Sequence, residues 1–145
     1  MKVKAIVVGD GSELEFLKNK YKDIDFVGWK NQSEILEYMK QARCLVFPSL
    51  WYETAGLTAI ESASLGVPVI VSDNTAATDY ITNNYDGLYF KTGNVNDLVK
   101  KIKITSDDKL VKKLSENAYS RNSDNPYSFE KYFDFIRYGI CQILI

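Results

Sequence analysis

The sequence predicts an α/β fold in which a parallel sheet carries helices on both faces, a three-layer α/β/α arrangement. Short apolar runs that resemble buried strands alternate along the chain with longer amphipathic segments that resemble helices. Several of the apolar runs end at Gly or Pro or in a polar turn, as buried parallel strands do. The chain has 145 residues and is 46% hydrophobic, which is enough for one domain with a sizeable core.

Five strands and seven helices are expected. The strands are expected over residues 4–8, 25–28, 44–47, 68–71 and 87–90. The helices are expected over residues 12–21, 33–42, 56–65, 76–82, 95–104, 107–119 and 128–140, with a polar linker over 120–125. Ser12 is the expected N-cap of the first helix, and Gly66 is the expected residue after the C-cap of the helix that starts near 56. We therefore expect a single domain over 1–145, with its core in about 1–104 and C-terminal helices in 105–145.

Charge and composition exclude several classes of function. The net charge is −1, so no broad basic field exists to hold nucleic acid or an anionic bilayer. The chain has no histidine, which excludes Ser-His-Asp and Cys-His catalysis and removes the commonest zinc ligand. The two cysteines, Cys44 and Cys141, argue against a disulfide framework, and Cys44 is expected as a small buried thiol. With no signal-peptide pattern and no apolar run of about 20 residues, we expect a cytoplasmic protein.

The segment 48–68 carries the chemistry of this chain. It follows a predicted strand with a loop that holds Glu53 and with a helix that starts near Gly56. Ligands of parallel sheets bind at the carboxyl ends of the strands, where this loop lies. Gly56 has no side chain, so a ligand can approach the backbone closely. The N–H groups of Gly56, Leu57 and Thr58, together with the helix dipole, favour an anion such as a diphosphate.

Two glutamates flank that helix start and fit two different tasks. Glu61 lies about one and a half turns into the helix, where a carboxylate can accept hydrogen bonds from the two vicinal hydroxyls of a ribose. Glu53 precedes the helix and can hold sugar hydroxyls or face positive charge that develops at an anomeric carbon. The alternative is that both are ordinary solvated surface carboxylates, since the spacing alone is a weak motif.

The segment resembles the E-x7-E signature of family 4 retaining glycosyltransferases. Ala55 stands where that family often has an aromatic residue and Ser62 where it often has Ala, and neither change removes a functional group. The resemblance extends over about 3–104 in an ordered series. Its other parts are the Gly9-Asp10-Gly11 turn after a strand, the Phe26-Val27-Gly28 strand, and the turn Asn83-Asn84-Tyr85-Asp86-Gly87-Leu88 before the last strand.

The resemblance implies the Rossmann-like C-terminal half of a GT-B glycosyltransferase of the hexosyltransferase type. Such a half binds a nucleotide-diphosphate sugar, with UDP or GDP as the nucleotide, and no metal or other cofactor is expected. Transfer would retain the anomeric configuration, in bacterial polysaccharide or glycan synthesis. The implied roles are donor sugar and catalysis for Glu53, diphosphate for Gly56, Leu57 and Thr58, ribose for Glu61, donor turn for Gly9 and Gly11, and the border of the base for Trp29 and Lys30.

Two parts of the family pattern are absent from these 145 residues. An Arg and a Lys that neutralise the diphosphate come just upstream of the Gly-Asp-Gly turn in the family, and the N-terminal domain holds the acceptor. We therefore expect the acceptor domain to be the missing partner, and the chain alone to bind donor weakly and to be inactive. Membrane contact is expected only through a full-length enzyme, and nucleic acid is not an expected partner. Asp79, where the family often has Glu, receives no role.

Three other interpretations were weighed. A dinucleotide fingerprint at Gly9-Asp10-Gly11 fails, because Leu14 stands where the third glycine is needed. The Asp23-Ile24-Asp25 motif precedes a strand, whereas a metal site would need it after one. A non-catalytic nucleotide-binding module or regulatory remnant of the same fold stays open. The aromatic segment 127–145 is expected to pack a terminal helix on the core or on the missing domain, through Phe129, Tyr132, Phe133 and Ile136.

Overall fold

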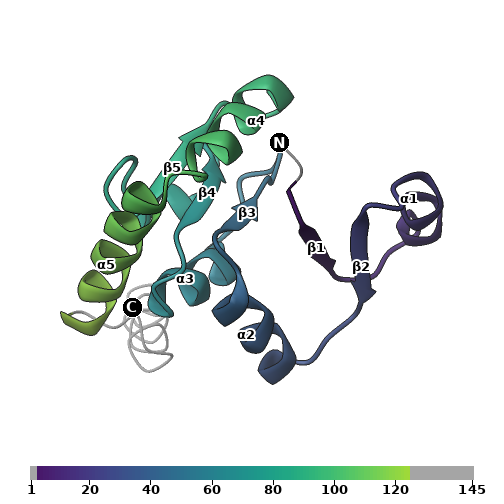
Figure 1. Cartoon of the computed structure of the whole chain (residues 1–145), viewed down its shortest axis with the longest axis horizontal. Helices are drawn as coiled ribbons and strands as arrows, with labels where there is room; N and C mark the ends of the chain where they lie inside the picture. Colours follow the sequence, from purple (N-terminus) through teal and green to yellow (C-terminus); the bar gives the residue numbers. More distant parts are fainter. Residues whose placement is uncertain (1–2, 125–145) are drawn as a thin grey trace, which may run out of the picture. The chain divides into compact units, whose positions relative to one another are not determined.

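The computed structural model describes residues 3–124 and divides the chain into two compact units (Figure 1). The first unit is Met1–Gln41 and the second is Ala42–Ile145, and each is described by itself. Every strand pair in both units is parallel, which confirms the predicted α/β class with a parallel sheet. The expected helix over 128–140 and the aromatic segment 127–145 lie outside the described residues.

The first unit contains two strands and two helices. They are β1 (Ala5–Val8), α1 (Leu14–Lys20), β2 (Ile24–Gly28) and α2 (Gln32–Gln41). The register pairs Ala5 with Ile24 and Val7 with Phe26, and an irregularity follows Val7. The backbone N–H of Gly9 donates to the carbonyl of Gly28 over 2.9 Å, so the turns after the two strands lie side by side.

The two helices of this unit begin differently. Ser12 was wrongly predicted as an N-cap, because α1 begins at Leu14 with Glu13 in the cap position and no side-chain cap. The start of α2 has a capping box: the Asn31 carboxamide oxygen accepts from the Glu34 N–H, and Glu34 accepts from the Asn31 N–H, each over 3.0 Å. The hydrogen bond from the Asn31 backbone lowers the pKa of Glu34.

The second unit is built on a three-stranded parallel sheet. Its strands are β3 (Leu45–Phe47), β4 (Val69–Ser72) and β5 (Gly87–Phe90), in the order β3-β4-β5. Its helices within residues 42–124 are α3 (Leu57–Ser64), the 3-10 helix η1 (Ala76–Asp79), α4 (Val95–Ile104) and α5 (Asp108–Asp124). Every residue of β4 is buried, because it lies between two strands and under helices on both faces.

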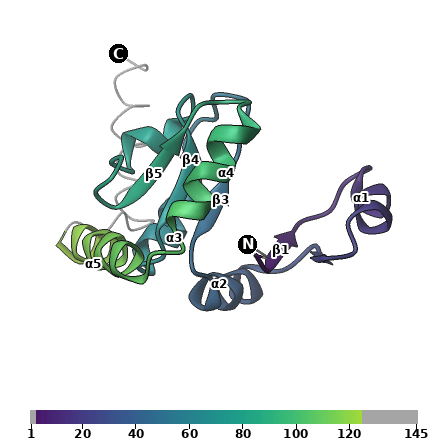
Figure 2. The same ribbon diagram turned by 45° about the horizontal axis from the view of Figure 1, so that its top comes forward.

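Alternate residues of the strands build two cores on opposite faces of this sheet. On one face Val69 and Val71 pack with α3, η1 and α5, through Ala59, Ala63, Ala77, Ile81 and Ala118. On the other face Ile70 and its neighbours pack with α4 and α5, through Leu88, Phe90, Leu98, Ile102 and Leu114. The second unit therefore has the predicted three layers, with its sheet between α3 and α4 (Figure 2). The α5 helix contributes Ala118 to one core and Leu114 to the other. Cys44 at the edge of the second core is half-buried, and burial raises the pKa of its thiol.

Gly66 ends α3 as predicted. It has a φ of +72°, and its N–H donates to the carbonyl of Ala63 while the N–H of Val67 donates to that of Ser62. These two hydrogen bonds are those of a Schellman motif, which needs a residue that tolerates positive φ. The motif turns the chain sharply from α3 into β4.

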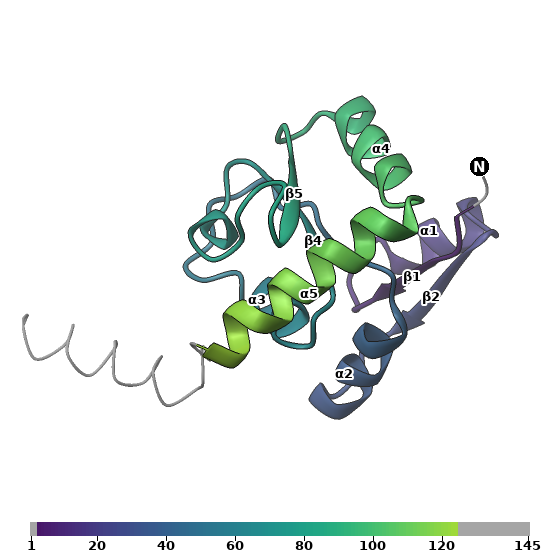
Figure 3. The same ribbon diagram turned by 60° about the vertical axis from the view of Figure 1, so that its left-hand side comes forward.

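The predicted linker over 120–125 is wrong. The α5 helix runs through it to Asp124 and passes along α3 (Figure 3). Arg121 donates to the Asp86 carboxylate over 2.6 Å and to the Thr82 hydroxyl over 2.9 Å. Asn122 is buried and donates to the Ala118 carbonyl over 2.8 Å. The Arg121 contacts are tertiary, the Asn122 hydrogen bond lies within α5, and together they override the weak helix propensity of the polar residues.

The Asp86–Arg121 pair locks the turn before β5 to α5. The side chain of Asp86 is 1% exposed, and it also accepts the N–H of Thr82 over 2.5 Å. A second Arg–Asp pair, Arg43 with Asp108, joins over 2.5 Å but is solvent-exposed, with side-chain exposures of 46% and 89%. The chain thus contains a buried and an exposed version of the same interaction.

We predict that Asp86→Ala lowers the free energy of unfolding by about 3 kcal/mol, because it leaves a buried N–H and a guanidinium without their carboxylate. Asp108→Ala, the matched control, should cost less than about 1 kcal/mol, since exposed pairs contribute little. Urea unfolding of both variants measures the difference. Equal losses would show that the contribution of the Asp86–Arg121 pair to stability does not depend on its burial.

Candidate functional site

The loop after β3 is fixed to the neighbouring strand at its first residue. The Ser72 hydroxyl, which is fully buried at the end of β4, donates to the Ser49 carbonyl over 2.6 Å. The Ser49 hydroxyl in turn donates to the Trp51 carbonyl over 3.2 Å and accepts the Trp51 N–H over 3.4 Å. The loop therefore leaves the carboxyl ends of β3 and β4 in a defined direction.

Gly56 is the residue that caps α3, and its neighbours explain why it is glycine. Its φ is +58°, a left-handed conformation that side chains disfavour. A Cβ at Gly56 would lie 3.0 Å from the Cβ of Ala77 and 3.3 Å from its backbone nitrogen. The place that a side chain would fill is thus taken by η1. Close approach of a ligand to Gly56 stays a prediction.

The first turn of α3 presents backbone N–H groups that the helix itself does not use. The first hydrogen bond that returns to the cap is from the Ala59 N–H to the Gly56 carbonyl, over 2.9 Å. Gly56 has no side chain to cap the turn, and the side chains of Leu57 and Thr58 are exposed. Orphan N–H groups at a helix N-terminus, with the helix dipole behind them, attract anions.

The two glutamates lie on either side of this turn. Glu53 is half-buried on the loop that leads to α3, and Glu61 is half-buried within α3. The residues after Glu61, which are Ser62 and Ala63, face the core. The structure thus brings the predicted set Glu53, Gly56, Leu57, Thr58 and Glu61 onto one loop and one helix of the second unit.

The stretch of sequence that holds this set has only acidic charged residues. Between Arg43 and Lys91 the sequence has no Lys or Arg at all. Its charged residues there are Glu53, Glu61, Asp73, Asp79 and Asp86. No side chain of this stretch can neutralise a diphosphate, so an anion at α3 relies on backbone N–H groups unless cations come from elsewhere.

The loops after β4 and β5 are tied together near the same sheet edge, a feature that sequence reasoning missed. Asp73 accepts the N–H of Thr92 over 2.9 Å and its hydroxyl over 2.8 Å. These two hydrogen bonds hold the pKa of Asp73 below its usual range. An Asp directly after one strand and a Thr shortly after the next were the available signal.

The remaining predicted residues lie together in the first unit. The N–H of Gly11 donates to the Asp10 carboxylate over 2.8 Å, and this turn lies beside the turn after β2 through the bond between Gly9 and Gly28. Trp29 in that second turn is 71% exposed. Lys30 forms an ion pair with Glu34 over 3.5 Å.

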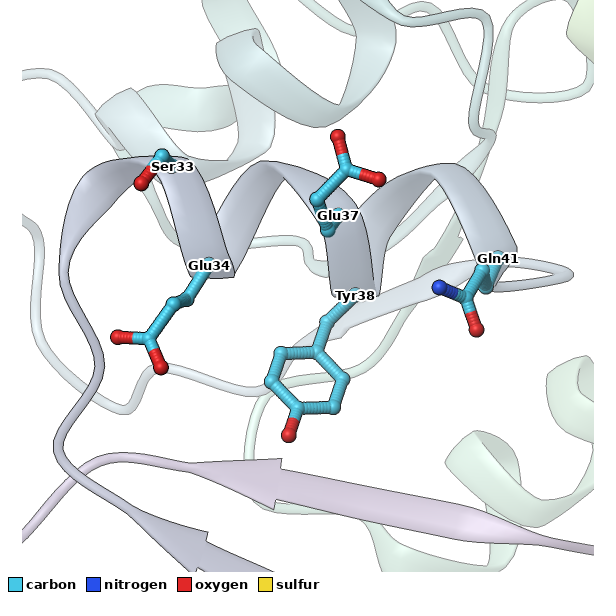
Figure 4. A pocket seen from close by; sticks show the side chains of 5 residues that line it. All are labelled: Ser33, Glu34, Glu37, Tyr38 and Gln41. Carbon is cyan, nitrogen blue, oxygen red and sulfur yellow. The ribbon is translucent and has the colours of Figure 1, made fainter.

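A hollow of about 410 Å³ runs along α2 in the first unit (Figure 4). Its lining residues are Ser33, Glu34, Glu37, Tyr38 and Gln41. They all come from one helix, and Glu34 and Tyr38 point to the same side of it. The hollow shares no residue with the predicted set, and one helix does not enclose a ligand, so no ligand is assigned to it.

Two searches of the described residues bear on cofactors and membranes. Over 3–124 no three or more Cys, Asp or Glu side chains lie close enough together to hold a metal ion. None of the helices in the same range has the length and apolar character to cross a bilayer.

The chain belongs to a glycosyltransferase family. The family profile "Glycosyl transferases group 1" matches residues 1–121, which is most of the chain. The resemblance to glycosyltransferases of this group is thereby confirmed.

Curated relatives from bacteria are similar over most of the chain. UDP-Gal:alpha-D-GlcNAc-diphosphoundecaprenol alpha-1,3-galactosyltransferase of Escherichia coli is 28% identical over 80% of this chain and 31% of its own length. N,N'-diacetylbacillosaminyl-diphospho-undecaprenol alpha-1,3-N-acetylgalactosaminyltransferase of Campylobacter jejuni is 32% identical over 81% of this chain and 32% of its own length. The chain spans about a third of the length of these relatives.

Solved structures show the same fold. Anabaena HepE in complex with UDP and glucose superposes with a TM-score of 0.80 at 18% identity, over 96% of this chain and 40% of that chain. Sucrose-phosphate synthase from Thermosynechococcus elongatus gives a TM-score of 0.79 at 24% identity, over 96% and 38%. The GT-B assignment of the fold is confirmed by these neighbours.

We predict that Gly56→Ala lowers the free energy of unfolding by about 2–3 kcal/mol, from left-handed strain and overpacking against Ala77. Gly93→Ala is the matched control: its φ is +74°, but the added Cβ would lie 3.9 Å from the nearest Leu50 atom. The control should lose about 1 kcal/mol from strain alone. Chemical denaturation measures both, and equal losses would remove the Ala77 contact as the reason for the glycine.

Proposed function

We propose that this chain is the donor-binding half of a retaining glycosyltransferase, which binds a nucleotide-diphosphate sugar for transfer to an acceptor held by another domain. The observation that carries the proposal is the start of α3, where N–H groups are free of helical partners and glutamates lie on both sides. The relatives support a role in bacterial polysaccharide or glycan synthesis, since their names describe sugar transfer to lipid-linked acceptors.

The diphosphate would bind the N–H groups of Gly56, Leu57 and Thr58. Glu61, further along the same helix, would accept hydrogen bonds from the ribose hydroxyls. The stretch between Arg43 and Lys91 has no cation. The resemblance to the family implies that an Arg and a Lys outside these residues would neutralise the remaining diphosphate charge, without a metal ion.

Glu53 would contact the donor sugar. A carboxylate at this place can hold sugar hydroxyls and stabilise positive charge that develops at the anomeric carbon as the diphosphate leaves. Such stabilisation acts in the transition state more than in the bound donor. Glu53 is thus the proposed catalytic residue of the chain.

The turns of the first unit carry the proposed base-binding residues. Trp29 presents an exposed indole on which a base can stack, and Gly9 and Gly11 in the adjacent turn have no side chain on either side of Asp10. Lys30, which forms an ion pair with Glu34, would also contact the base. UDP and GDP are the proposed nucleotides, and a cytoplasmic location stays a prediction.

The alternative function is a non-catalytic nucleotide-binding or regulatory module of the same fold. It would keep the helix start and Glu61 but would not need Glu53. Comparison of the two glutamates therefore separates the enzyme from the module.

We predict that Glu61→Ala weakens UDP binding about 10- to 150-fold, the usual effect of losing hydrogen bonds to a charged group. Glu53→Ala should leave UDP affinity nearly unchanged, because UDP has no sugar beyond its diphosphate. Isothermal titration with UDP, and with NAD as the ligand that should not bind, measures both variants. Glu116→Ala, an exposed glutamate on α5, serves as the control.

Equal losses of UDP affinity in the two variants would contradict the division of labour between the glutamates. If neither variant loses UDP affinity, both glutamates are ordinary solvated carboxylates and the proposed site is wrong. In a full-length enzyme, Glu53→Ala should lower kcat more than it raises KM for the donor, and the opposite pattern would argue for the binding module.

We also predict that the purified 145-residue chain transfers no sugar from UDP-glucose or UDP-galactose to a lipid-linked saccharide, because the chain spans about a third of its relatives' length and the proposed function places the acceptor on another domain. A radiolabelled-sugar assay with and without EDTA measures this. Transfer by the chain alone would overturn the proposed need for a second domain, and loss of that transfer with EDTA would overturn the proposed independence of metal.

A further inference from the structure

Three consecutive side chains before Glu53 are exposed although each has a large apolar surface. Leu50 is 63% exposed, Trp51 is 81% exposed and Tyr52 is 66% exposed. Large apolar side chains that gather at one place on a surface commonly mark a binding site. The three residues are defined here as the aromatic loop.

The aromatic loop is held by the structure at its base. Its first neighbour, Ser49, accepts a hydrogen bond from buried Ser72 and fixes the backbone of Trp51 with its hydroxyl. Leu50 reaches the turn after β5, with its Cδ2 atom 3.9 Å from the Cβ position of Gly93. The backbone of Trp51 is therefore anchored, which lowers the cost of ordering this loop when a ligand binds.

The residue types of the loop and of its sequence neighbours favour a neutral ligand. Indole and phenol rings offer flat apolar faces together with an N–H and an O–H. No Lys or Arg occurs between Arg43 and Lys91, and the nearest charge along the chain is the Glu53 carboxylate. An anionic lipid surface or a nucleic acid backbone would meet no cation of this stretch. A sugar ring has apolar C–H faces and neutral hydroxyls, and it matches both properties.

We propose that Trp51 and Tyr52 form a binding subsite for a sugar ring of the acceptor, next to the place where Glu53 meets the donor. The assignment to the acceptor rests on the proposed function, because Glu53 would already be occupied by the donor sugar. The proposal that a saccharide binds here at all rests only on the exposed side chains of the aromatic loop. The ring would stack on the indole and hydrogen-bond to the Tyr52 hydroxyl.

The test uses the two tryptophans of the chain as reporters. Their indole N–H signals in an NMR spectrum are assigned with Trp29→Phe and Trp51→Phe, and the titration is done on the unchanged chain. The probe is methyl N-acetyl-β-D-glucosaminide, with glycerol at equal concentration as the control. We expect a saturable shift of the Trp51 signal at about millimolar probe, an affinity typical of a small weak ligand, and no shift of Trp29.

Variants and competitors separate the explanations. Tyr52→Ala should weaken the probe at least about tenfold, while Tyr85→Ala, an exposed tyrosine outside the aromatic loop, should leave its affinity unchanged. Saturating UDP-glucose should not displace the probe. The subsite would be overturned if the titration did not saturate or if both tryptophan signals shifted equally. It would also be overturned if the glycoside had no effect and the Trp51 signal was instead lost on addition of phosphatidylglycerol vesicles.

Displacement of the probe by UDP-glucose, but not by UDP, would overturn the acceptor assignment and give the subsite to the donor sugar. Failure of the proposed function has a different signature. In that case UDP would shift no backbone signal of Gly56, Leu57 or Thr58, while the Trp51 response to the glycoside would persist.

Discussion

The burial of β4 is the constraint on which the second unit depends. This strand has a parallel neighbour on each side and helices over both faces, so all of its residues are buried. Its last residue, Ser72, holds the start of the loop that carries Glu53, and the Schellman motif at Gly66 sets where the strand begins. The position of the candidate site therefore follows from the packing of one four-residue strand.

Local patterns predicted most of the strands and helices, because their causes lie within a few residues. The apolar runs became strands, and Gly66 ended α3 since only a residue tolerant of positive φ suits that place. Features with distant causes were missed. The continuation of α5 depends on the contact of Arg121 with Asp86, and the capping of α3 by a glycine depends on Ala77. Nothing in local periodicity reports such contacts.

In the candidate site, too, some features could be predicted from the sequence and others could not. The loop and helix that hold Glu53, Gly56 and Glu61 form one continuous segment, so the sequence could place them together. The sequence does not distinguish Trp51 and Tyr52 from core residues, because aromatic residues beside a strand usually belong to a core. Only their exposure in the structure distinguishes them. The sequence shows that no Lys or Arg lies near the helix start along the chain. Only the structure shows at which residue α3 begins, and therefore which backbone N–H groups are available to an anion.

The pairing of Asp86 with Arg121 also has a consequence for how the chain matures on the ribosome. Synthesis runs from the N-terminus, so the carboxylate emerges 35 residues ahead of its guanidinium. During that interval a buried Asp86 would have no countercharge, and an unpaired charge is costly to remove from water. The turn before β5 therefore stays hydrated until α5 has been translated. Docking of this turn would therefore come late in the synthesis of the second unit, once Arg121 is available.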